Sequence, residues 1–177
     1  MALPGNPGLA QMCTATTIPT ESANAWCAMY GKILVAVDGS PASTRGLDEA
    51  LRLAKQTGGK LLLVHVVDEL IVVDVPALNY QLITESLRES AVKVLEEARE
   101  RVRRSDVPYE QKLIETLGVR AADEIVREAK QWSADLIVMG THGRRGLKRL
   151  AMGSDAEMVL RRAPVPVLVV RDKPESP

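Results

Sequence analysis

A chain of 177 residues is long enough for one domain with a hydrophobic core and too short for two. Its 23 basic and 23 acidic residues cancel, so the overall charge gives no reason to expect a nucleic-acid or membrane partner. Apolar residues make up 46% of the chain but aromatic residues only 3%, which predicts an aliphatic core suited to helices packed on a buried sheet.

The first 28 residues are predicted to be a disordered extension, because they are rich in Pro, Gly, Ser and Thr and show neither strand nor helix periodicity. They contain both cysteines, Cys13 and Cys27, so the rest of the chain cannot form a disulfide framework or a thiolate metal site. Neither a membrane span nor a signal peptide is recognisable. We expect a soluble, cytoplasmic protein with one domain at residues 29–173 and a C-terminal tail at 174–177.

From Lys32 onward, apolar runs rich in β-branched residues alternate with helical patterns. The runs predict strands at Lys32–Asp38, Lys60–Val67, Tyr109–Leu117, Ala134–Gly140 and Val165–Val170. The helical patterns predict a helix from Pro41 to Gly58 with Ser40 as N-cap, a third helix over Ala122–Ala129 and a fourth over Ser154–Arg162. The second is a long helix that follows an irregular stretch near Asp74 to Pro76, has an apolar face from Leu87 to Val102, and is closed by Pro108.

Strands that alternate with helices indicate parallel pairing through right-handed crossovers. The predicted fold class is therefore α/β: a single-domain, five-stranded, mostly parallel, doubly wound sheet with helices on both faces, of the Rossmann-like type. Ligands bind such sheets at the carboxyl ends of the strands, where the winding reverses. Asp38 and the residues from Gly140 onward fall at such ends.

The glycine segment, Met139–Ser154 ("MGTHGRRGLKRLAMGS"), has a composition typical of a phosphate-binding loop. Its four glycines permit positive φ and close approach of another backbone or a ligand, and consecutive backbone N–H groups in such a loop form an anion nest. Ser154 begins a predicted helix whose N-terminus adds positive potential. Four basic residues and no acid lie between Gly140 and Arg149, namely Arg144, Arg145, Lys148 and Arg149. Phosphate is the ligand group that this pattern predicts.

Two better known phosphate loops are excluded. A Walker A loop requires Gly-Lys-Ser/Thr, and here Leu147 follows Gly146. The dinucleotide fingerprint belongs after the first strand, where this chain has only Asp-Gly-Ser-Pro.

The spacing Gly140-x2-Gly143-x9-Gly153-Ser154 resembles the ATP-binding signature of the universal stress protein family. The likeness extends from about Lys32 to Arg171, and it implies an adenine nucleotide alpha hydrolase-like fold for the domain at 29–173. It also implies that Asp38 lies near the ribose and phosphates, either directly or through Mg²⁺. Val66 is expected to lie against the adenine. The residues expected to bind the cofactor are Val37, Asp38, Val66, Met139, Gly140, His142, Gly143, Arg144, Gly153, Ser154 and Asp155. Asp155 would oppose a triphosphate unless a cation intervenes.

Structural alternatives stand beside these roles. Asp38 also fits a turn at a strand end, and His142 also fits a solvent-facing loop residue. His65, inside an apolar strand, is expected to be a packed histidine held by a backbone hydrogen bond. Trp132 is expected in the core rather than as a cofactor platform. The four basic residues of the glycine segment also fit a solvated surface, although we expect one or two of them to touch phosphate.

Pro164 and Pro166 bracket the last strand, which favours a sheet edge where missing N–H donors are tolerated. In the family this strand commonly pairs with its copy, so the resemblance implies a homodimer through Val165–Val170. No membrane or nucleic-acid partner is expected.

The leading functional hypothesis is an ATP-binding stress regulator with at most slow ATP hydrolysis, since the glycine segment offers no obvious general base and no catalytic residue is assigned. One alternative is a nucleotide-independent, dimeric interaction module. Another is an ATP-consuming enzyme of a related α/β fold, but its Ser-Gly-Gly-x-Asp-Ser, His-Ile-Gly-His and Lys-Met-Ser-Lys-Ser motifs are not in the sequence.

Overall fold

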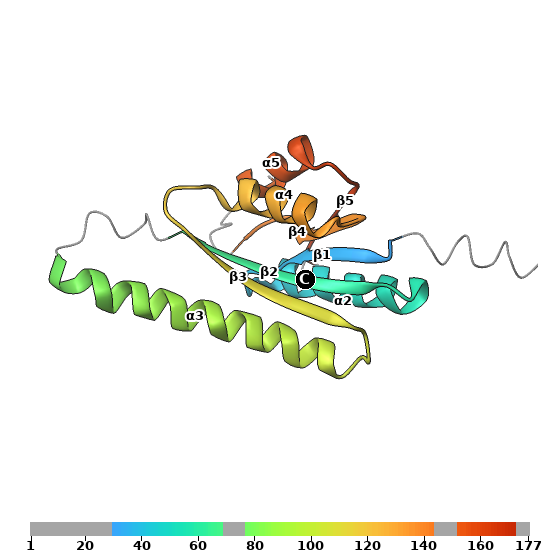
Figure 1. Ribbon diagram of the computed structural model, residues 1–177, viewed down its shortest axis with the longest axis horizontal. Helices are drawn as coiled ribbons and strands as arrows, with labels where there is room; N and C mark the ends of the chain where they lie inside the picture. Colours follow the sequence, from blue (N-terminus) through green and yellow to red (C-terminus); the bar gives the residue numbers. More distant parts are fainter. Residues whose placement is uncertain (1–29, 69–76, 144–151, 173–177) are drawn as a thin grey trace, which may run out of the picture.

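The computed structural model describes residues 30–68, 77–143 and 152–172, which form a sheet with helices on both faces (Figure 1). Its strands are β1 (Lys32–Ala36), β2 (Lys60–Asp68), β3 (Tyr109–Thr116), β4 (Leu136–Gly140) and β5 (Val167–Val170). Its helices are α2 (Pro41–Thr57), α3 (Ala77–Arg103), α4 (Ala121–Trp132) and α5 (Ser154–Arg162). The extension predicted at residues 1–28 and the tail predicted at 174–177 lie outside the described residues.

The strand order is β3-β2-β1-β4-β5, and every neighbouring pair is parallel. The predicted α/β fold with five parallel strands is therefore confirmed. The chain first builds outward from β1 to β3 and then crosses back to place β4 on the other side of β1. The winding thus reverses between β1 and β4, and the carboxyl ends of these two strands are where such a sheet binds its ligands.

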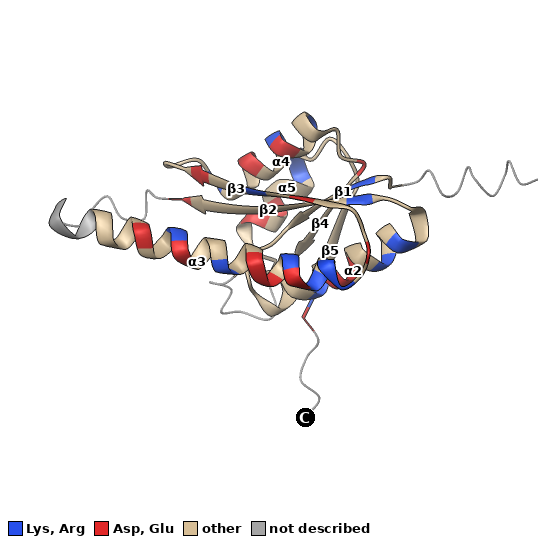
Figure 2. Cartoon of the chain, turned by 60° about the horizontal axis from the view of Figure 1, so that its bottom comes forward, with Lys and Arg blue, Asp and Glu red and all other residues tan. Residues whose placement is uncertain are grey.

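Two hydrophobic clusters, one on each face of the sheet, hold the helices in place. Ile33 and Val35 of β1 pack into the cluster beneath α2 and α3, whereas Leu34 between them points to the opposite cluster beneath α4 and α5. All three side chains are fully buried, and each contributes about 1.5–3 kcal/mol by leaving water. Figure 2 shows acidic and basic residues interspersed along α3, whose outer face meets solvent.

The loop between β1 and α2 is held by the start of α2. Ser43 N–H donates to the Ser40 side chain at 3.2 Å, and Pro41 occupies the first helical turn. Gly58 ends the helix in the left-handed region, with φ of 69°. The predicted N-cap and stop of this helix are both confirmed, and the N-terminal turn holds Asp38 through Ser40 and Ser43.

Several predicted boundaries shift in the structure. β1 ends at Ala36, so Val37 and Asp38 lie beyond the strand, and β5 begins at Val167 rather than at Val165. α3 ends at Arg103, before Pro108, because the chain turns through Asp106 at positive φ. The predicted edge position of β5 is confirmed, and β3 forms the opposite edge. Within the described residues, no helix has the length and apolar character that crossing a membrane requires.

Trp132 combines two environments. It packs partly buried against the cluster beneath α4 and α5, as expected of a core residue. Its ring also lies below two ammonium groups, those of Lys32 at 4.9 Å and Lys60 at 5.2 Å from the ring centre. Trp132, Lys32 and Lys60 thus meet at the amino ends of β1 and β2, at the opposite end of the sheet from the expected ligand site.

Candidate functional site

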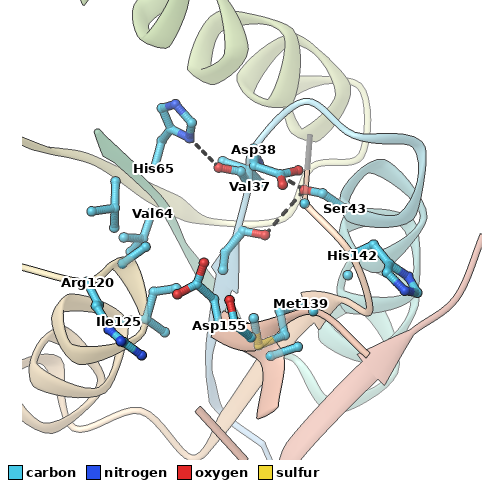
Figure 3. A pocket seen from close by; sticks show the side chains of 18 of the residues that line it. Val37, Asp38, Ser43, Val64, His65, Arg120, Ile125, Met139, His142 and Asp155 are labelled. Atoms are coloured by element: carbon cyan, nitrogen blue, oxygen red, sulfur yellow. Dashed lines mark hydrogen bonds between the residues drawn. The ribbon is translucent and has the colours of Figure 1, made fainter. Parts of the chain in front are cut away.

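A cavity of about 690 Å³ opens at the carboxyl ends of β1, β2 and β4, and the first residues of α4 and α5 complete its wall (Figure 3). The strand ends bring Val37, Asp38, Val66, Met139 and Gly140 to this cavity. The glycine segment and α5 bring His142, Gly143, Gly153, Ser154 and Asp155. The structure thus gathers all of the predicted site residues that it describes around one cavity, whereas Arg144, Arg145, Lys148 and Arg149 lie outside the described residues.

The position of Asp38 is determined by hydrogen bonds to the start of α2. Its Oδ1 accepts from Ser40 N–H at 2.9 Å, and its own N–H donates to Ser43 Oγ at 3.1 Å. Ser43 Oγ in turn donates to the carbonyl of Ala36 at 3.3 Å. The carboxylate is therefore held at the end of β1 with its second oxygen, Oδ2, turned toward the glycine segment.

Gly140 and Gly143 are explained by close packing rather than by positive φ. A Cβ on Gly143 would stand 2.8 Å from Asp38 Oδ2, and a Cβ on Gly140 would stand 2.8 Å from the backbone nitrogen of Ser43. Ser40 Oγ also donates to the carbonyl of His142 at 3.2 Å, which joins the two loops directly. Of the two properties expected of these glycines, close approach is confirmed at Gly140 and Gly143, where the β1–α2 loop and the glycine segment touch, whereas neither residue has positive φ.

The two described ends of the glycine segment are joined through Thr141. Its carbonyl accepts from Gly153 N–H at 2.9 Å, and its own N–H donates to the carbonyl of Val170 in β5 at 2.8 Å. Gly153 lies close to the same carbonyl, since a Cβ there would be 3.2 Å from it. Thr141 is buried and was not singled out from the sequence, where only its place beside Gly140 could have indicated it.

The two histidines have different surroundings. His65 is buried, and its Nδ1 bonds to the carbonyl of Val37 at 2.5 Å, which confirms the packed histidine with a backbone hydrogen bond. The ring nevertheless lines the cavity. His142 is half-buried, and its Nδ1 lies 3.0 Å from Thr141 Oγ1.

In the described part of the chain, the series of backbone bonds between β2 and the β1 side is recorded up to Val64 and not at Val66. Lys60 N–H donates to the Gly31 carbonyl and Val37 N–H to the Val64 carbonyl, so the even-numbered residues of β2 direct their backbone groups toward β1. The next donor in this series is Val66 N–H, and its natural acceptor is the Val37 carbonyl that His65 bonds. No backbone bond from Val66 to the β1 side is found among the described residues. Its N–H and C=O therefore offer an adjacent donor and acceptor at the cavity.

The described wall of the cavity carries more negative than positive charge. Asp38, Asp68 and Asp155 line it, and among its described residues Arg120 is the sole lysine or arginine. Asp68 and Arg120 were not among the site residues expected from the sequence, because neither belongs to a recognisable motif. Only the sheet order brings them to the same cavity as Asp38.

Within the described residues, no group of three or more His, Cys, Asp or Glu side chains could hold a metal ion. Mg²⁺ does not require such a cage, since it is commonly bound by one or two carboxylates together with substrate phosphates and water. Asp38 and Asp155 line the same cavity and fit that requirement.

The comparisons with known proteins agree with this fold. The model of the universal stress protein family matches residues 29–171. The universal stress protein MJ0531 of Methanocaldococcus jannaschii is 38% identical over 149 residues, which cover 84% of this chain and 85% of that protein. The structure of MJ0577 from the same organism is similar with a TM-score of 0.72 and 27% identity, covering 83% of this chain and 99% of that one. The structure of an Archaeoglobus fulgidus universal stress protein in complex with dAMP is similar with a TM-score of 0.60 and 26% identity, covering 80% and 98%.

Proposed function

Because the chain belongs to the universal stress protein family, we propose that it binds an adenine nucleotide, ATP in the first place, in the cavity at the carboxyl ends of β1, β2 and β4. Nucleotide occupancy then regulates the conformation of the protein or its contact with partners. The solved relative in complex with dAMP supports the class of ligand. The protein is proposed to act in the cytoplasm as a homodimer that pairs through β5.

The observation that carries this proposal is the open backbone at Val66. An adenine presents a ring-nitrogen acceptor beside an amino donor, which matches an N–H and a C=O on one strand edge. The apolar side chains of Val37 and Met139 line the same cavity and suit the faces of a base. The proposed place of the base is thus beside β2, and that of the ribose and phosphates is beside β1 and β4.

The phosphates are proposed to lie between Asp38 and the start of α5. Gly153 occupies the N-cap position of α5 without a side-chain cap, so the first N–H groups of this helix are open to an anion. Asp155 stands in the same helical turn, and its charge opposes a bare triphosphate. Asp38 and Asp155 would hold Mg²⁺ at this place, and the bound ion would supply positive charge that neutralises the phosphates.

Slow hydrolysis at most is proposed. Rapid phosphoryl transfer requires a group that orients the attacking water together with stabilisation of the transferring phosphate. Asp38 Oδ1 is already occupied by Ser40 N–H, and His142 Nδ1 lies beside Thr141 Oγ1. These bonds hold the two side chains in place for binding, and no further group that would orient an attacking water is assigned.

Nucleotide carried by the purified protein is the first test. The protein is denatured directly after purification and released nucleotides are identified by mass; ATP and adenosine are then titrated with and without Mg²⁺. Ser154→Glu is the informative variant, because a carboxylate in the first turn suits the helix but repels phosphate. Ser154→Gln is its neutral control of equal size.

We expect Ser154→Glu to weaken ATP binding by about tenfold or more and adenosine binding little, because charges at contact distance in a partly dry site interact by more than a kcal/mol. If the parent carries no nucleotide and neither ATP nor adenosine raises its melting temperature, the proposed function is wrong. The excess of carboxylates on the described wall would then favour the nucleotide-independent interaction module.

A further inference from the structure

Arg120 occupies an unusual position for an arginine of this chain. It directly precedes α4 at the N-cap position, makes no side-chain cap there, and lines the cavity with an exposed side chain. Most arginines of the described residues pair with a carboxylate, as Arg88 does with Glu115 and Arg162 with Asp123. No ion pair is recorded for Arg120 within the described ranges, so its guanidinium is available to a ligand.

The sheet order places Arg120 at the end of the cavity that lies away from the glycine segment. The loop before it is tied to β2, since Gly118 N–H donates to Asp68 Oδ1 at 2.9 Å. The glycine segment instead follows β4, on the far side of β1. Figure 3 shows Arg120 and Ile125 on one side of the cavity and His142 on the other. Val66 belongs to β2, so it lies on the Arg120 side.

Because Arg120 and Val66 lie on the same side of β1, the Arg120 guanidinium stands nearer to the proposed place of the base than to the glycine segment. A nucleobase carries no net charge, but its faces attract a flat cation and its ring nitrogens accept hydrogen bonds. The guanidinium group is planar and weakly hydrated, so it can lie against a base or donate to its edge, whereas an ammonium group does neither as well. Ile125, one turn along α4, offers apolar contact beside it.

We propose that Arg120 contacts the nucleobase of the bound nucleotide and contributes to affinity through the base, independently of the number of phosphates. This inference rests on the proposed function, since it requires a nucleotide whose base lies beside Val66. It adds a recognition residue from α4 to a site that the sequence places on β1, β2 and the glycine segment.

The experiment measures dissociation constants of adenosine and of ATP with Mg²⁺ for the parent, Arg120→Ala and Arg120→Lys. Lys130→Ala is the matched control, because Lys130 is an exposed cation on the same helix that does not line the cavity. Arg120 is exposed, so both variants are expected to fold, and their melting temperatures verify this.

We expect Arg120→Ala to weaken the binding of adenosine and of ATP by the same factor, about threefold to tenfold. Arg120→Lys should weaken both nearly as much. The salt dependence of ATP binding should equal that of the parent, because no phosphate contact is removed. Lys130→Ala should bind both ligands as the parent does.

Three results would overturn the inference. A loss confined to ATP would place Arg120 on a phosphate, and unchanged affinities would remove it from the site. Full recovery in Arg120→Lys would reduce its role to charge alone. A parent protein that binds neither ligand would instead refute the proposed function, and the inference with it.

Discussion

Gly143 and Asp38 approach so closely that a methyl group on the glycine would stand 2.8 Å from the carboxylate oxygen Oδ2. The two residues are 105 positions apart in the sequence, and the reversal of winding between β1 and β4 brings them together. Because Oδ1 is already held by Ser40 N–H, the carboxylate has little freedom to turn away.

Gly143→Ala is therefore expected to displace the Asp38 carboxylate and to weaken ATP binding by about tenfold, while the fold is retained with a loss of about 1 kcal/mol. Calorimetric titration with ATP and urea denaturation measure the two effects. Gly31→Ala is the control, because a Cβ there meets Asp135 Oδ2 at an ordinary 3.6 Å. Equal ATP affinity of the two variants would show that the Asp38 position does not matter for binding.

Ser43→Ala removes the hydroxyl that links Asp38 N–H to the Ala36 carbonyl. Ser43 is buried, so the partners lose a bond that water does not readily replace, and the free energy of unfolding should fall by about 1–3 kcal/mol. ATP binding should weaken as well, because the Asp38 backbone is no longer held. Ser90→Ala is the comparison, since within the described residues its hydroxyl bonds to the Ser86 carbonyl of the same helix, α3. Similar stability of the two variants would contradict this prediction.

Glu110 gives a pH-dependent prediction at the opposite end of the sheet. The hydrogen bond from Lys60, and to a smaller extent that from Trp132, lowers the pKa of Glu110 from its ordinary value. A carboxylate with a lowered pKa in the folded state stabilises the protein above the ordinary Glu pKa, and this contribution is lost as the pH falls through the folded-state pKa.

The difference in the free energy of unfolding between the parent and Glu110→Gln should therefore be largest near neutral pH and should shrink below about pH 4. It should also decrease with added salt, because Glu110 is exposed and surface ion pairs are screened. Urea denaturation of both proteins, near neutral pH and below about pH 4, measures this difference in the free energy of unfolding. A difference that stays constant with pH would mean that the ionised form of Glu110 has no special stabilisation.

The proposed dimer can be tested by one backbone donor at the β5 edge. Ile137 N–H donates to the Pro166 carbonyl, and Thr141 N–H donates to the Val170 carbonyl. The backbone N–H and C=O groups of the even-numbered residues of β5 therefore face β4. The N–H of Val169 accordingly faces the open edge. Val169→Pro removes that donor and leaves the bonds to β4 in place.

We expect Val169→Pro to convert the dimer to a monomer in sedimentation experiments, with a circular dichroism spectrum like that of the parent. Leu168→Pro is the comparison, since it removes a donor to β4 and should lower the melting temperature. A dimer that persists in Val169→Pro would place the subunit contact on another surface.

Sequence periodicity predicted the elements well where the signal was local. The α2 helix begins and ends where Ser40, Pro41 and Gly58 indicate, because caps act over a few residues. α5 has the predicted bounds, and β3 and β5 stand at the sheet edges. Strand ends were less accurate, since β1 stops at Ala36 although Val37 N–H still bonds to the Val64 carbonyl, and apolar character alone does not mark that point.

The sequence by itself determined the alternation of strands and helices, the aliphatic core and the glycine spacing, because each depends on residues close together in the chain. Only the tertiary structure decided why Gly143 must be small, why the backbone of Val66 is open, and that Asp68 and Arg120 line the same cavity as Asp38. These relationships join residues on different strands and helices. They follow from the order β3-β2-β1-β4-β5, which packing of the whole sheet selects and no single segment encodes.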